Sequence, residues 1–128
     1  MLHIPGLYIA NSENRGRGVF TAQDLSKGDL IEICPLLFIP KKEVAKIHKT
    51  IIHDYYFLLE KPKGAACIAL GYGSIYNHNP KPNAIVIFDY EKEEIEIQCK
   101  KKINAGSEIF IDYTDGGKGN NELWFSPV

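Results

Sequence analysis

An Asn-His pair stands among backbone-restricting residues in the stretch 71–83, GYGSIYNHNPKPN. Pro80 and Pro82 fix φ and remove backbone donors, so we expect an irregular path outside any sheet. The preceding glycines permit close backbone approach or positive φ. Asn77 and His78 would then be polar groups in a rigid loop, a common setting for a binding or catalytic site. The alternative is a surface turn, because Asn, Pro and Gly are ordinary turn residues.

Two further groups could take part in chemistry. Gly16 and Gly18 flank Arg17, so backbone N–H groups there could approach a carboxylate or phosphate while the arginine adds positive charge. We interpret this motif as an exposed turn entering a strand at Val19, and no helix follows, which excludes dinucleotide binding. Tyr113 ends the apolar stretch EIFIDY. Considered alone, a tyrosine in an apolar strand is more often a core or edge residue than a catalytic one.

The composition indicates one globular domain, residues 1–128, large enough for a hydrophobic core of its own. The 15 basic and 16 acidic residues give a net charge of −1, so no global field attracts nucleic acid or a membrane. The apolar runs are too short to span a bilayer, and the N-terminus lacks the pattern of a secretory signal. We therefore expect an intracellular protein, in either cytoplasm or nucleus.

The three cysteines, Cys34, Cys67 and Cys99, are odd in number and far apart, which argues against a disulfide framework and fits a reducing compartment. We expect them to be small buried hydrophobes. No C-x-x-C is present, and His48 and His53 are five residues apart, so they do not share one helical face. We predict no metal site.

Many short strands and one helical segment predict a mainly β domain. In residues 40–54, Val44, Ile47 and Ile51 recur at helical spacing, with lysines on the other face. Pro35 interrupts a strongly apolar strand and indicates a bend or a sheet edge. Residues 84–89 and 94–100 should form a β-hairpin, and its second arm, EIEIQCK, alternates, so one face should be buried. The expected strands cover residues 7–10, 30–39, 55–59, 65–70, 84–89, 94–100 and 108–113, and the tail after them is expected to be loop-like through Asn121.

In this order, the motifs GRGVF, YNHNPKPNA and GSEIFIDY resemble the SET domain of protein lysine methyltransferases, across nearly the whole chain. The sequence segment LGYGSIYNH resembles the corresponding segment of small stand-alone bacterial or viral members of that family. The resemblance implies a β-clip fold of several short sheets, with residues 40–64 as a variable helical insert. It also implies that the C-terminal segment threads beneath the Asn-His loop, as in a pseudoknot, which brings Tyr113 beside Asn77 and His78.

The same resemblance implies an S-adenosylmethionine site and a role for each matching residue. Tyr113 would lie at the methyl-transfer centre and also contact the cofactor. Glu108 would be mainly structural. The cofactor would be bound by Gly16, Arg17, Gly18, Asn77 and His78, with Trp124 as an aromatic cover.

The chain also departs from the family pattern. Asn79-Pro80 replaces the usual Ser-Cys, and no cysteine cluster follows Tyr113, so residues 114–128 would form a lid without zinc. Ile111 stands where many members carry Phe or Tyr, at a position that governs how many methyl groups fit. Tyr55 and Tyr56 could line the lysine channel, although a stripe of aromatic residues is more often part of a core.

The sequence and the resemblance together predict transfer of methyl groups from S-adenosylmethionine to a lysine of a protein substrate, such as a histone or histone-like protein. A small chain has little surface to build both a channel and a lid, so we expect a homodimer. Two alternatives stay open. One is an inactive module that binds a peptide or cofactor, and the other is a purely structural β-clip domain.

Overall fold

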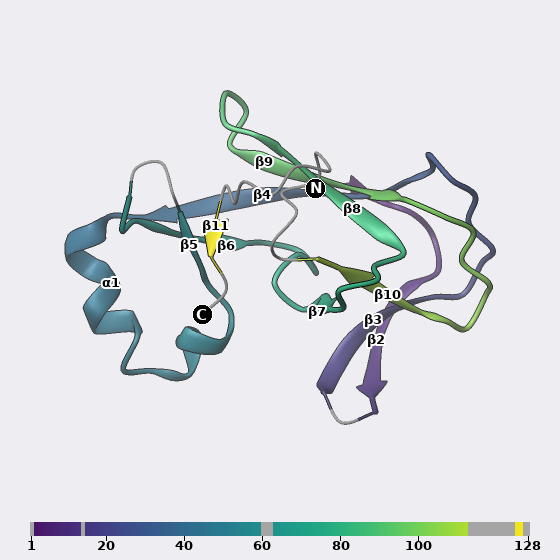
Figure 1. Cartoon of the computed structure of the whole chain (residues 1–128), viewed down its shortest axis with the longest axis horizontal. Coiled ribbons are helices and arrows are strands. Elements are labelled where there is room, and N and C mark those ends of the chain that lie inside the picture. Colours follow the sequence, from purple (N-terminus) through teal and green to yellow (C-terminus); the bar gives the residue numbers. More distant parts are fainter. Residues whose placement is uncertain (1, 14, 60–62, 113–124, 127–128) are drawn as a thin grey trace.

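The computed structural model describes residues 2–13, 15–59, 63–112 and 125–126 (Figure 1). Within these residues there are one α-helix, one 3-10 helix and several short strands. The helices are α1 (Lys41–Ile47) and η1 (Ile51–Asp54). The strands are β1 (Leu2–His3), β2 (Leu7–Ser12), β3 (Gly16–Thr21), β4 (Leu30–Ile39), β5 (Phe57–Leu59), β6 (Ala66–Ala69), β7 (Asn77–His78), β8 (Ala84–Asp89), β9 (Glu94–Cys99), β10 (Glu108–Ile111) and β11 (Phe125–Ser126).

The described strands form a larger and a smaller sheet. The larger sheet runs β11-β5-β6-β4-β9-β8, with β1 also paired to β4, and the smaller runs β2-β3-β10-β7. Figure 1 shows the helical insert at one end of the molecule and the β2–β3 hairpin toward the other. The predicted mainly β architecture with one short helical insert is therefore confirmed.

The long strand β4 connects the two halves of the larger sheet. Its residues up to Pro35 pair with β9, and from Leu36 onward they pair with β6. The expectation that Pro35 marks a sheet edge is therefore wrong, because β4 lies inside the sheet. Pro35 instead stands where the strand changes partner, a place where fewer ladder hydrogen bonds depend on its missing N–H.

Alternation along β9 builds much of the main core. Ile95, Ile97 and Cys99 are buried, whereas the residues between them are partly exposed. The predicted hairpin of β8 and β9 is confirmed in full register, from Ala84 opposite Cys99 to Asp89 opposite Glu94. One face of this hairpin therefore packs into the molecule while the other meets solvent.

The helical insert departs from the predicted face at its second turn. Val44 and Ile47 pack inward as expected, but Ile51 is 73% exposed and Ile52 packs inward in its place. Thr50 causes the shift, since it adopts an extended backbone and its hydroxyl accepts from the Ile52 N–H. A new 3-10 turn thus starts here, out of phase with α1.

The expected aromatic strand 55–59 is shorter than predicted and begins at Phe57. The tail contains a strand that the sequence did not indicate, since Phe125–Ser126 pairs antiparallel with β5. Two residues are too few to show a periodicity, so only the partner strand identifies them. No helix in the described part of the chain is long and apolar enough to cross a membrane.

Cys34, Cys67 and Cys99 are free and buried, as predicted. Burial raises the pKa of the Cys67 thiol to about 12. The pKa of Cys34 is also raised, mainly by burial and further by the negative charge of Glu32. These thiols therefore keep their protons in the folded state at pH values where an unfolded thiol ionises.

This difference predicts a loss of stability in alkali. An unfolded thiol has a pKa of about 8.5, so only the unfolded state releases the Cys67 proton between about pH 8.5 and 12. At pH 10 the free energy of unfolding should be lower than at pH 7.5 by about 2 kcal/mol for each such thiol. Urea unfolding at the two pH values measures the effect. In the Cys67→Ala variant the pH-dependent loss should be smaller, and an equal loss would contradict the assignment.

Candidate functional site

The Asn-His pair lies in a short parallel ladder against β10. Asn77 is opposite Phe110 and His78 is opposite Ile111, and the Asn79 N–H donates to the Ile111 carbonyl at 2.9 Å. The expected non-sheet path is therefore wrong for these two residues, because the prolines begin only after the ladder ends. The predicted approach of the C-terminal segment to the Asn-His loop is confirmed through Asp112, and Tyr113 lies outside the described residues.

The glycine motif also lies in a strand. Gly16 starts β3 opposite Ser12 of β2, so the hairpin turn comes before the motif. The expectation that the motif itself forms the turn is therefore wrong. Gly16 has φ of +72°, which a glycine adopts without strain at this position. Gly18 is buried and Arg17 is exposed. The motif thus presents a close-packed backbone on one side and a charged side chain on the other.

Glu108 joins the glycine strand to the Asn-His ladder. Its Oε1 accepts from the Ser12 hydroxyl at 2.6 Å, and its Oε2 accepts from Asn77 Nδ2 at 2.7 Å. A Cβ on Gly18 would overlap Glu108 Oε2 and lie 2.8 Å from Asn77 Nδ2. Only glycine therefore leaves room for this carboxylate to reach the asparagine. The expected structural role of Glu108 fits this geometry.

The orientation of the Asn77 amide follows from its acceptors. Nδ2 donates to Glu108 Oε2 and also to the Arg17 carbonyl oxygen, at 3.1 Å. Both neighbours can only accept, so a flipped amide would place Oδ1 against two oxygens. No described group of the protein donates to Oδ1. The side chain consequently offers an acceptor, and not a donor, to a ligand.

Two further contacts hold the surroundings of the ladder. His78 Nδ1 lies 3.7 Å from Asp112 Oδ1, and both side chains are partly exposed. The Arg15 guanidinium lies 5.2 Å from the centre of the Phe110 ring, within range of a cation–π interaction. Both contacts join segments that are far apart in the sequence. The first contact supports the β7–β10 pairing from outside its backbone hydrogen bonds, and the second ties the turn before β3 to β10.

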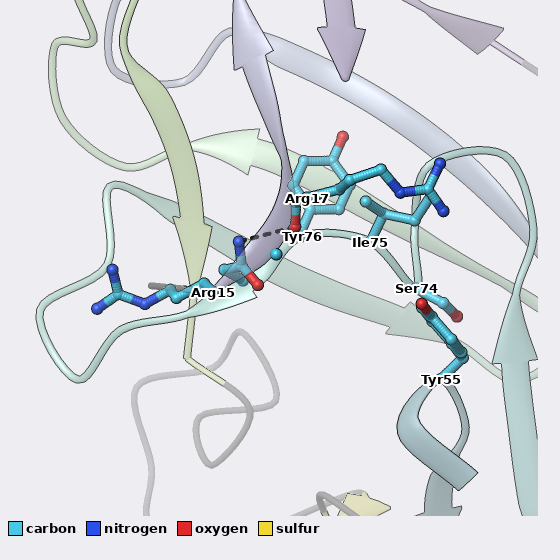
Figure 2. A pocket seen from close by; sticks show the side chains of 8 residues that line it. Arg15, Arg17, Tyr55, Ser74, Ile75 and Tyr76 are labelled. Carbon is cyan, nitrogen blue, oxygen red and sulfur yellow. Dashed lines mark hydrogen bonds between the residues drawn. The ribbon is translucent and has the colours of Figure 1, made fainter. Parts of the chain in front are cut away.

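A cavity of about 260 Å³ opens beside Asn77. Of the predicted site residues, Gly16, Arg17, Asn77 and Tyr55 line it. Figure 2 shows Arg17 extending past Ile75, while the Arg15 side chain runs in the opposite direction. The described lining consists of Arg15, Gly16, Arg17, Tyr55, Ser74, Ile75, Tyr76 and Asn77.

The other predicted residues lie elsewhere. Tyr56 is buried, and its hydroxyl lies 2.8 Å from His48 Nδ1 inside the insert, so the core alternative describes it better. Ile111 is 2% exposed and belongs to the main core. Gly18 is buried and His78 is half-buried within the β7–β10 ladder, and neither is among the described residues that line the cavity. Trp124, like the expected catalytic tyrosine, falls outside the described residues.

The sequence analysis missed several residues of the wall, namely Arg15, Ser74, Ile75 and Tyr76. Only Ser74 could have been found from its near neighbours in the sequence, because its hydroxyl hydrogen-bonds to backbone groups five residues earlier. It donates to the Ala69 carbonyl and accepts from the Ala69 N–H, each at 3.0 Å. Among the described residues, no group of three or more His, Cys, Asp or Glu side chains could hold a metal ion.

Comparison with known proteins identifies the family of this chain. The model of the SET domain family matches residues 16–114, most of the chain, and the chain therefore belongs to the SET-domain family. It is 31% identical over 120 residues to the histone-lysine N-methyltransferase, H3 lysine-37 specific, of Schizosaccharomyces pombe. That match covers 93% of this chain and 76% of the yeast protein.

Solved structures support the same family. A Plasmodium falciparum protein provisionally called a histone methyltransferase is 30% identical, with a TM-score of 0.62, over 88% of this chain and 95% of that one. A chain of the Chaetomium thermophilum Polycomb Repressive Complex 2, in an autoinhibited conformation bound to S-adenosylmethionine, has a TM-score of 0.68 at 20% identity. This chain spans only 16% of that chain's length, so the likeness concerns the fold alone.

Proposed function

We propose that this protein transfers methyl groups from S-adenosylmethionine to the side-chain amine of a lysine in a protein substrate. The observation that carries the proposal is the Asn77 amide. Its two N–H groups are used inside the protein, so its Oδ1 is the atom available to a ligand at the cavity. An acceptor held in this way suits the α-ammonium of the cofactor.

The methionine end of the cofactor carries both an ammonium and a carboxylate, and the cavity offers a partner for each. Asn77 supplies the acceptor for the ammonium, and Arg17 supplies a cation for the carboxylate. Gly16 keeps the strand backbone accessible, since it carries no side chain into the cavity. We assign His78 and Trp124 to the adenosine end, as the family resemblance implies.

The cofactor supplies an electrophilic methyl group on a sulfonium, and the protein must prepare the amine that attacks it. A lysine with a pKa of about 10.4 is almost fully protonated at neutral pH. The site therefore has to bring the lysine into a desolvated channel and let its proton leave before attack. We assign the orientation of the amine to the Tyr113 hydroxyl, with Tyr55 on the cavity wall beside the channel.

Replacing Tyr113 with phenylalanine tests this assignment. We expect kcat to fall at least about 100-fold, because the variant loses the group that orients the amine, while the dissociation constant for S-adenosylmethionine changes less than about threefold. Tyr90→Phe is the matched control, since Tyr90 is exposed in the β8–β9 turn. This variant should retain full activity. Unchanged turnover in Tyr113→Phe would remove this tyrosine from the reaction.

The substrate class follows from the relatives and is part of the proposal. The yeast relative is named for lysine 37 of histone H3, and we extend the histone class, though not the particular lysine, to this chain. The experiment is incubation with methyl-labelled S-adenosylmethionine and purified core histones, followed by analysis of methylated lysine. Label in methyl-lysine supports the proposal. Cofactor binding with no label on histones or on a lysine-rich peptide array would instead favour an inactive binding module.

The homodimer and the intracellular location stay predictions from the sequence. Sedimentation equilibrium at high protein concentration tests the first of them. The division into residues 40–64 as insert and 114–128 as a lid without zinc also stays a prediction.

A further inference from the structure

A buried carboxylate that the proposed reaction does not use directly lies behind the cavity wall. Glu32, in β4, is 0% exposed. The Tyr76 hydroxyl donates to its Oε1 at 2.7 Å, and the Tyr72 backbone N–H donates to its Oε2 at 3.0 Å. In the described part of the chain, no lysine or arginine forms an ion pair with it.

The partners of Glu32 indicate its charge. The Tyr76 hydroxyl and the Tyr72 N–H both donate to it, so the group acts as an acceptor, as an ionised carboxylate does. Burial and the negative charge of Glu32 raise the pKa of Tyr76, which therefore keeps its proton. The same two causes, burial first, raise the pKa of Cys34. Within the cluster of Glu32, Tyr76 and Cys34, the formal charge is therefore the negative charge of the Glu32 carboxylate. The apolar side chains around the cluster screen this charge only weakly.

The cluster is connected to the cavity through one side chain. Tyr76 lines the cavity, immediately before Asn77, and its hydroxyl ends at Glu32 (Figure 2 shows the tyrosine). The carboxylate therefore lies about one tyrosine side chain behind the wall. Tyr72, the other anchor, lies two residues before Ser74, the first of the consecutive lining residues 74–77. Glu32 consequently holds both ends of the segment that leads into Asn77.

We propose that Glu32 sets the charge preference of this cavity: its buried carboxylate, held behind the wall by Tyr76 and Tyr72, makes the cavity favour the cationic sulfonium cofactor over the uncharged thioether product. This inference rests on the proposed function. It adds a positioning residue that touches neither substrate nor cofactor and acts through the Tyr76 side chain and through its field.

The physical reason is that the two ligands differ at one centre. S-adenosylmethionine carries a positive sulfur and one more methyl group, whereas S-adenosylhomocysteine has a neutral sulfur, and the rest of the two molecules is the same. Arg15 and Arg17 on the cavity wall act on both ligands, but neither forms an ion pair with Glu32, so the buried negative charge strengthens binding of the first ligand selectively. If Glu32 only held the wall segment against β4, its replacement would lower the affinities for both ligands by the same factor.

The test is the ratio of the two dissociation constants in Glu32→Gln, measured by calorimetry with each ligand in separate titrations. Glutamine keeps the shape and can still accept from Tyr72 and donate to the Tyr76 oxygen. We expect S-adenosylmethionine to lose about fivefold more affinity than S-adenosylhomocysteine. Glu32→Asp keeps the charge and should keep the wild-type ratio.

Tyr76→Phe is the control for positioning alone, because it removes the hydroxyl donor and leaves the carboxylate in place. It should weaken both ligands equally. An unchanged ratio in Glu32→Gln overturns the inference, whether or not both affinities fall. If Glu32→Gln does not fold, the same ratio is measured in the double variant Glu32→Gln/Tyr76→Phe against Tyr76→Phe. Wild-type protein that binds neither ligand would refute the proposed function itself, which is a different outcome.

Discussion

Replacing Asn77 with alanine is expected to weaken S-adenosylmethionine binding about 30-fold or more. The variant loses the acceptor for the ligand ammonium, a charged hydrogen bond of about 2 kcal/mol. It also leaves Glu108 Oε2 and the Arg17 carbonyl without the donor they share. Equilibrium dialysis with labelled cofactor measures the loss. Because two internal hydrogen bonds disappear as well, the melting temperature should fall at the same time.

Asn104→Ala separates the loss of this particular amide from the loss of any asparagine. Asn104 is exposed in the turn before β10, and the bond that its backbone carbonyl accepts from the Ser107 N–H survives the substitution. The control should bind the cofactor as wild type does. If Asn77→Ala is folded and binds within twofold of wild type, the acceptor role of Asn77 is wrong.

Gly18→Ala is expected to damage both the fold and the site. The added Cβ would overlap the Glu108 carboxylate and press against Asn77 Nδ2, so the bridge between them must open. Overpacking of this kind costs about 2 kcal/mol in the free energy of unfolding, measured by urea titration. Cofactor affinity should fall about tenfold or more, because the Asn77 amide is no longer held.

Gly28→Ala is the matched control for that substitution. Gly28 has φ of +92° and nothing within 4 Å of an added Cβ, so alanine there costs about 1 kcal/mol of backbone strain without crowding. It lies in the turn before β4, and cofactor binding should not change. Gly18→Ala protein that binds the cofactor with wild-type affinity would show that the Glu108–Asn77 contact does not matter to the site.

Local pattern was enough to predict the parts of the fold that depend on near neighbours. The alternation of EIEIQCK predicted β9 and its hairpin, because each side chain there faces either the core or solvent. The phase of the insert was wrong by one residue, since the Thr50 cap depends on a single hydroxyl. Hydrophobic periodicity carries no information about such a cap.

The site itself depends on contacts that periodicity does not encode. Asn77 meets Glu108 across 31 residues, and the ladder that joins them is two residues long. The family resemblance implied that the C-terminal segment threads beneath the Asn-His loop, but it did not predict this contact between Asn77 and Glu108. Glu32 was overlooked because a polar residue in an apolar strand is expected to face outward. Its burial depends on Tyr76, 44 residues further along the chain.

The most direct test of the central claim is calorimetric titration of the wild-type chain with S-adenosylmethionine. We predict saturable binding of one cofactor per chain, with release of heat as the ammonium reaches Asn77 and the carboxylate reaches Arg17. Absence of binding at millimolar cofactor, in protein shown to be folded by its thermal transition, would contradict the account and leave the chain as a SET-domain scaffold without the chemistry proposed for it.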